Sequence, residues 1–159
     1  MGEGVFSAGE TVNTLLAIFE KHCHERVCVV GTKCVGKTTL LKRLHGCVDM
    51  DAEVFSQISE AEARFINQTP WTKEIGDEVD RLVYKYAEIK PGKPMFGTVI
   101  VDCEAVVYLD IGDDLLREHC RMRGVDYDDA IRMKQAIEGD WNNHKAMQNK
   151  MFYYIMITE

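Results

Sequence analysis

The stretch GTKCVGKT, residues 31–38, combines glycines, lysines and threonines in a spacing that suits phosphate binding. Gly31 and Gly36 let the backbone turn so that successive N–H groups point at a phosphate, and the start of a helix adds partial positive charge. Lys37 is placed to reach the β- and γ-phosphate oxygens of a nucleotide, and Thr38 to offer its hydroxyl to Mg²⁺. The residues expected to contact the nucleotide are Gly31, Thr32, Lys33, Cys34, Val35, Gly36, Lys37, Thr38 and Thr39.

The elements that must position this loop follow from the apolar spacing of the chain. Short apolar runs predict strands at 26–30, 47–51, 98–102, 105–111 and 152–158. Helical spacing predicts helices ending near Lys21 and covering 37–44, 57–67, 71–88, 113–123 and 126–139, with a turn-rich link at 90–97. Strands that alternate with helices predict an α/β fold, a mostly parallel sheet of about five strands with helices on both faces. One domain is expected over residues 1–159, with 1–25 as an N-terminal helical extension.

Composition limits the classes of protein and partner. At 159 residues the chain is long enough for one domain with a sizeable core. Its net charge of −7 at pH 7 disfavours a nucleic-acid partner and favours a small anionic ligand. No apolar run is long enough to cross a bilayer, the N-terminus lacks signal-peptide features, and the 6 cysteines have no disulfide-framework spacing. These features predict a cytoplasmic protein without a membrane partner, as a monomer or homodimer.

GTKCVGKT resembles the Walker A loop of P-loop NTPases, and further stretches resemble the small kinases of that superfamily. CVDMDAEVF (47–55) resembles the acceptor-site segment of shikimate-kinase-like enzymes. AVVYLDIGDDLLREHCRMRG (105–124) resembles the fourth strand and lid-entry helix of adenylate and shikimate kinases, and VDYDDAIRMKQAIE (125–138) resembles the helix that leaves the lid. The resemblance implies a P-loop kinase fold with a lid-type helical region at about 113–145, and ATP and Mg²⁺ as cofactors.

Asp49 and Asp51 are the candidate catalytic carboxylates. They stand at the end of an expected strand soon after the phosphate loop. Either could accept the proton of an acceptor hydroxyl or orient Mg²⁺. The alternative is that one of them caps the helix that follows.

Arg121, Arg123 and Arg132 are the candidate lid cations. In the kinases that the chain resembles, lid arginines close over the transferring phosphoryl group, which implies this role for Arg121 and Arg123. Both also lie at the end of an expected helix, where cations suit the helix dipole, so a solvent-exposed position is the alternative. The resemblance further implies that Arg132 contacts a nucleotide phosphate.

Asp102 ends the apolar run TVIVD (98–102) and is a candidate Mg²⁺ ligand together with Thr38. P-loop NTPases place an aspartate at such a strand end, although a turn residue is the alternative. Only Cys103 and Glu104 separate this run from the next strand, which is too few residues for a parallel crossover. The two runs are therefore expected to form a hairpin or one long bent strand.

Together these features predict an ATP-dependent phosphotransferase that moves the γ-phosphoryl group to a small acceptor. The two aspartates favour a hydroxyl acceptor. A nucleoside monophosphate kinase is the first alternative and would need Arg64 and Arg81 to grip the acceptor phosphate. A polynucleotide or modified-DNA kinase and a nucleotide-binding module without an acceptor are the others. Trp71 is expected either to stack on a base of the acceptor or to lie in the core.

Overall fold

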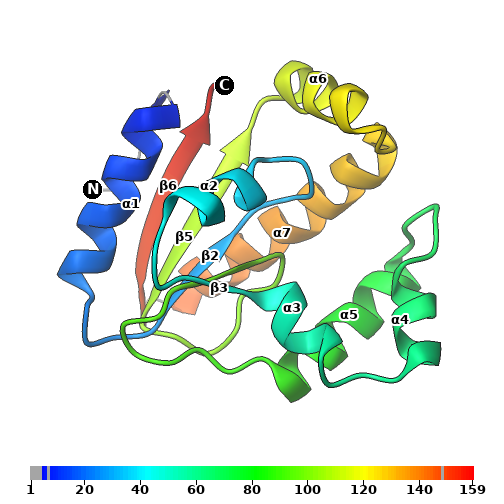
Figure 1. The fold of residues 1–159 in the computed structure, drawn as a ribbon, viewed down its shortest axis with the longest axis horizontal. Coiled ribbons are helices and arrows are strands. Elements are labelled where there is room, and N and C mark those ends of the chain that lie inside the picture. The colour runs from blue at the N-terminus through cyan, green and yellow to red at the C-terminus, as the bar shows by residue number, and fades with distance from the viewer. Residues whose placement is uncertain (1–4, 7, 148) are drawn as a thin grey trace.

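The computed structural model describes residues 5–6, 8–147 and 149–159, and it has an all-parallel sheet at its centre (Figure 1). The strands are β1 (Val5–Phe6), β2 (Val27–Val30), β3 (Val48–Asp49), β4 (Met95–Gly97), β5 (Ala105–Ile111) and β6 (Met151–Ile157). The helices are α1 (Ala8–Lys21), α2 (Lys37–Arg43), α3 (Met50–Phe55), α4 (Glu60–Ile66), α5 (Lys73–Tyr86), α6 (Asp113–Arg123) and α7 (Tyr127–Met147). The strand order is β1-β6-β5-β2-β4-β3, and every neighbouring pair is parallel. The predicted α/β fold is confirmed.

Helices cover both faces of the sheet. Successive side chains of a strand point to opposite faces, so each strand contributes to a core on either side. In β2, Val27 and Val29 pack in a core that α1, α2 and α6 complete. Cys28 and Val30 belong to a second core, on the other face, that α3, α5 and α7 complete. Figure 1 shows α3, α4 and α5 grouped on the side of the molecule away from α1. The central strand is thus buried on both faces, as expected for a parallel sheet.

The N-terminal helix is part of this packing. α1 ends at Lys21, as its apolar spacing predicts, and it buries Leu15 and Ile18 in the first core. β1 extends the sheet by pairing with β6, and the sequence did not predict this strand. None of the described helices is long and apolar enough to cross a membrane.

The connection between β4 and β5 differs from the sequence prediction. Residues 90–97, expected as a link, contain strand β4, whereas TVIVD (98–102), expected as a strand, is a loop. This loop is apolar because it is buried: Val99, Ile100 and Val101 pack in the second core, and the Cys28 thiol donates to the Val99 carbonyl at 3.5 Å. The loop crosses β2 and returns to the start of β5, so β4 and β5 flank β2 in parallel. The predicted hairpin or bent strand is therefore wrong.

The strand predicted at 47–51 is shorter than expected. β3 covers only Val48–Asp49, and α3 begins at Met50. Met50 is fully buried and lies against Gly97 of β4, where a Cβ atom would come within 2.4 Å of its sulfur. The close approach between Gly97 and Met50 fixes where α3 leaves the sheet.

This contact gives a prediction on stability. We expect Gly97→Ala to lower the free energy of unfolding by about 1–3 kcal/mol, because the new methyl group overlaps Met50. Gly139→Ala is the matched control, since Gly139 lies exposed within α7 and a Cβ there has no neighbour within 4 Å. It should raise the free energy of unfolding by about 0.5–1 kcal/mol through helix propensity. Urea unfolding measures the stability of both variants. Equal effects of Gly97→Ala and Gly139→Ala would contradict the close packing of Gly97 on Met50.

Candidate functional site

The candidate phosphate-binding loop, residues 31–38 and called the phosphate loop, runs from the carboxyl end of β2 into the start of α2. Cys34 and Gly36 have positive φ angles, 66° and 118°, and the second of these suits glycine because it has no Cβ. Neighbouring elements hold the loop in place. The Thr32 hydroxyl donates to the Ala130 carbonyl of α7 at 2.6 Å, and the His119 ring of α6 donates from Nδ1 to the Cys34 carbonyl at 2.8 Å. Sequence reasoning missed His119, which no local motif marks.

Lys37 lies within this loop. Its ammonium donates to the carbonyls of Gly31 and Thr32, the latter at 2.8 Å. Burial lowers the pKa of Lys37 to about 8, and the nearby Asp51 carboxylate opposes part of this shift. A half-buried cation interacts more strongly with an added anionic charge than an exposed one does.

Two cavities meet at the loop. The first, of about 430 Å³, lies between α2, α6 and the end of β6 and is called the α2–α6 cavity. The second, of about 270 Å³, lies between the loop, α3, α5 and α7 and is called the α3–α5 cavity. Cys34, Thr38 and Arg123 line both. Lys37 lines the α3–α5 cavity and Thr39 the α2–α6 cavity, so a molecule in either would lie beside the loop.

The two candidate carboxylates, Asp49 and Asp51, have different positions at the start of α3. Asp49 is the N-cap of α3 and accepts a hydrogen bond from the Asp51 N–H at 3.1 Å. Asp51 lines the α3–α5 cavity together with Lys37 and Thr38. Burial raises the pKa of Asp51, the Asp49 carboxylate adds to the shift, and Lys37 and Lys33 oppose it. A carboxylate with a raised pKa is a better proton acceptor at neutral pH.

The three candidate lid arginines have different surroundings. Arg123 is exposed at the end of α6 and lines both cavities. Arg121 is turned to solvent and donates from Nε to Glu118 at 3.1 Å. Arg132 donates to Asp129 at 3.0 Å and lines neither of the two cavities. The structure therefore brings Arg123 to the phosphate loop and leaves Arg121 and Arg132 away from it.

Comparison of the sequence with protein-family models and with curated proteins gives no match. Function is therefore inferred from the geometry and chemistry of the site itself.

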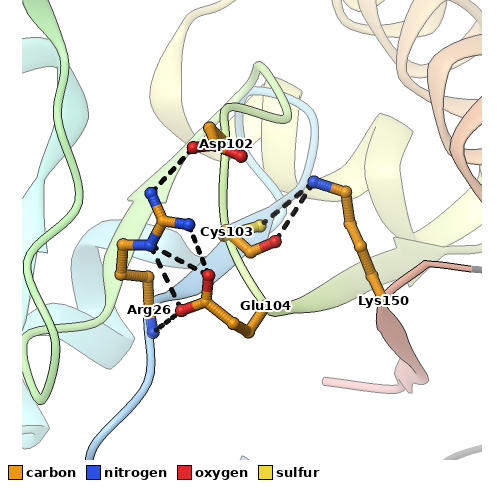
Figure 2. A network of polar contacts seen from close by, with 5 residues as sticks. All are labelled: Arg26, Asp102, Cys103, Glu104 and Lys150. Carbon is orange, nitrogen blue, oxygen red and sulfur yellow. Dashed lines mark hydrogen bonds and ion pairs between the residues drawn. The ribbon is translucent and has the colours of Figure 1, made fainter.

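Asp102 does not lie at the phosphate loop. Figure 2 shows it beside Arg26, whose Nη1 donates to Asp102 at 2.8 Å and whose Nε donates to Glu104 at 3.0 Å. Arg26 immediately precedes β2, whereas the loop follows β2, so Asp102 lies at the opposite end of this strand. The predicted magnesium role of Asp102 is wrong because the strand on which it depended is a loop.

The same network holds the β4–β5 loop against the start of the sheet. Glu104 also accepts from the Arg26 backbone N–H at 2.7 Å, and these contacts with Arg26 lower the pKa of Glu104. Lys150 donates to the Cys103 carbonyl at 3.2 Å (Figure 2). The cluster ties three segments together, which is a structural role.

Thr38 and Asp51 both bring side-chain oxygens to the α3–α5 cavity, beside the phosphate loop. Mg²⁺ prefers oxygen ligands and takes one or two from the protein, with phosphate oxygens and water completing its shell. A threonine hydroxyl and a carboxylate on one cavity fit this demand. Within the described residues, no group of three or more His, Cys, Asp or Glu side chains could hold a metal on its own. The site thus fits an ion that arrives with a phosphate ligand.

A third cavity, of about 430 Å³, lies between α5 and α7 and contains the carboxylates of Asp77, Asp80 and Asp140. Burial raises the pKa of Asp80 to about 6, and the charges of Asp140 and Asp77 add to the shift. The folded-state pKa exceeds the ordinary value of 3.8, so the ionised Asp80 carboxylate lowers the free energy of unfolding. This penalty is complete above about pH 6 and shrinks to nothing as the pH falls towards 4.

Asp80→Asn should therefore raise the free energy of unfolding by about 1 kcal/mol at pH 7.5, after allowance for solvent screening at this half-buried position. The gain should disappear near pH 4. Thermal unfolding at both pH values measures the effect, with Asp114→Asn on the exposed first turn of α6 as the control that leaves stability unchanged or slightly lower. If Asp80→Asn raised the free energy of unfolding equally at both pH values, the effect would not come from the charge of Asp80.

Proposed function

We propose that this chain is an ATP-dependent P-loop kinase that transfers the γ-phosphoryl group to a hydroxyl of a small acceptor. The observation that carries this proposal is the shared lining of the α3–α5 cavity: Lys37 and Thr38 of the phosphate loop face the same space as the carboxylate of Asp51. A nucleotide-binding loop alone needs no second cavity with a proton acceptor. A phosphotransferase needs both, because two substrates must meet beside the phosphate.

Each residue has a role that its surroundings support. The α2–α6 cavity holds the nucleotide, and Lys37 neutralises charge on the transferring phosphoryl group. Arg123 borders both cavities and adds positive charge where they join. Asp51 accepts the proton of the acceptor hydroxyl. Thr38 would hold Mg²⁺, which supplies charge neutralisation at the phosphates when bound.

The acceptor is a small molecule in this proposal. The net charge of −7 does not favour a polynucleotide, whose backbone would be repelled. All 6 cysteines are free thiols, which is consistent with a reducing, cytoplasmic compartment.

The proposal is tested by following label from γ-labelled ATP into a panel of alcohols. We expect at least one alcohol to become labelled and to raise the rate of ADP release with its own concentration. ATP hydrolysis at one rate with and without every acceptor would contradict the kinase proposal and favour a nucleotide-binding module that acts on a partner.

A further inference from the structure

Beyond Asp51, most of the side chains that line the α3–α5 cavity are apolar. They form a wall with contributions from α3, α4, α5 and α7 and from the segment before α5, among them Phe55, Ile66, Trp71, Val79, Leu82 and Met133. Leu82 is fully buried beneath this wall. The sequence offered no local signal for this set, because its members come from five separate places in the chain. Such a wall favours a ligand with an apolar body.

The cations of this cavity lie at its phosphate-loop end. Among the described residues that line it, the positively charged side chains are Lys33 and Lys37 of the loop and Arg123, which lies beside the loop. Arg64 and Arg81, which a phosphorylated acceptor would need, do not line it. Arg81 instead donates to Glu62 at 3.1 Å and to Glu78 at 2.6 Å. An anionic group at the far end of the cavity would lose water without gaining a cationic partner, which is unfavourable.

Neutral polar groups and one aromatic ring complete the wall. Asn67 can both donate and accept a hydrogen bond, and Thr98 carries a hydroxyl. The ring of Trp71 packs on Gly76, where a Cβ atom would come within 2.6 Å of it. The backbone N–H of Trp71 donates to the buried Asp129 carboxylate at 2.9 Å, so both the backbone and the ring are held in place. A fixed ring beside an amide suits a planar, uncharged ligand.

From these contacts we propose that the acceptor is an uncharged alcohol with a planar, largely apolar body, of the nucleoside or aryl-alcohol class. Its body lies along Trp71 and Val79, a polar edge meets Asn67, and its hydroxyl lies at Asp51. The volume of about 270 Å³ is near the lower end for ligand sites and suits a body of one or two rings. This inference rests on the proposed kinase function, which it deepens.

In the proposed reaction, the γ-phosphoryl group passes from ATP to the acceptor hydroxyl. The hydroxyl oxygen forms a bond to the γ-phosphorus as its proton passes to Asp51. The bond from the γ-phosphorus to the oxygen that bridges it to the β-phosphorus breaks, and its electron pair leaves with ADP. The products are a phosphate monoester, ADP and one proton, which Asp51 later releases.

Matched pairs of ligands test the acceptor class by binding. Calorimetry on the full chain loaded with Mg²⁺ and a non-hydrolysable ATP analogue would compare nucleosides with their 5′-monophosphates, and aryl alcohols with ring-carboxylated analogues. We expect the neutral member of at least one pair to bind at least about tenfold tighter than its anionic partner. The two kinds of pair distinguish a nucleoside from a simpler aryl alcohol.

Two variants sharpen this test. Asn67→Arg should place a cation at the polar edge and reduce or reverse, by about tenfold, the preference for the aryl alcohol over its ring-carboxylated analogue. Arg81→Ala, outside the cavity, is the matched control and should leave both affinities within about twofold. If the anionic members bind as tightly as the neutral ones to the wild-type protein, or if no member of any pair binds, the acceptor class is wrong. Selective binding of neutral alcohols without any γ-phosphoryl transfer would instead refute the kinase proposal and leave the selectivity of the cavity intact.

Discussion

Lys37→Ala is expected to lower the rate of phosphoryl transfer by about a thousandfold or more while the fold stays intact. The ammonium of Lys37 is held by two carbonyls of the phosphate loop and faces the cavity in which the phosphoryl group would move. Steady-state kinetics with γ-labelled ATP measure the loss.

Stability should respond far less than activity to this change. Burial lowers the pKa of Lys37 to about 8, so near pH 7 the folded chain holds this cation at a cost that alanine removes. The melting temperature should therefore stay within a few degrees of the wild-type value, and Lys21→Ala, exposed at the end of α1, should change neither property. Transfer by Lys37→Ala at a near-normal rate would refute the role of the loop in catalysis.

Asp51→Asn should lower the rate of acceptor phosphorylation by about a hundredfold or more and leave ATP affinity within a few-fold. Asparagine keeps the size and much of the hydrogen bonding of aspartate but cannot take up the hydroxyl proton. The loop residues that we propose hold ATP are unchanged. Burial raises the pKa of Asp51, which brings this carboxylate nearer to the range of an effective base at neutral pH.

Asp49→Asn is the matched control for this experiment. Asp49 caps α3, and asparagine is an equally good N-cap, so this variant should keep both its stability and near-normal transfer. Kinetics of both variants with one acceptor decide the assignment. If Asp49→Asn lost activity while Asp51→Asn kept it, the two carboxylates would have to exchange roles.

Stretches with a continuous local pattern were predictable from the sequence. The phosphate loop depends on glycines and a lysine at fixed spacing within one segment, and this spacing marks the segment without any tertiary contact. The bounds of α6 at Asp113–Arg123 follow from its apolar spacing, and β6 was recognisable as an apolar run. Alternation of such helices and strands implied a parallel α/β sheet, because parallel neighbours require crossovers.

Only the tertiary structure decided which candidate residues meet at the site. Arg121 and Arg123 lie two positions apart on α6, and a helix turns about 100° per residue, so the two side chains point about 200° apart and only one can face the loop. TVIVD resembles a strand in sequence, but burial makes loops apolar as well, and its true path carries Asp102 to the far end of β2. The apolar wall around Trp71 comes from segments that are distant in sequence, and their meeting depends on how α3, α5 and α7 pack on the sheet. Local spacing therefore marked the candidate phosphate-binding loop, whereas packing between distant elements decided the surroundings of the α3–α5 cavity.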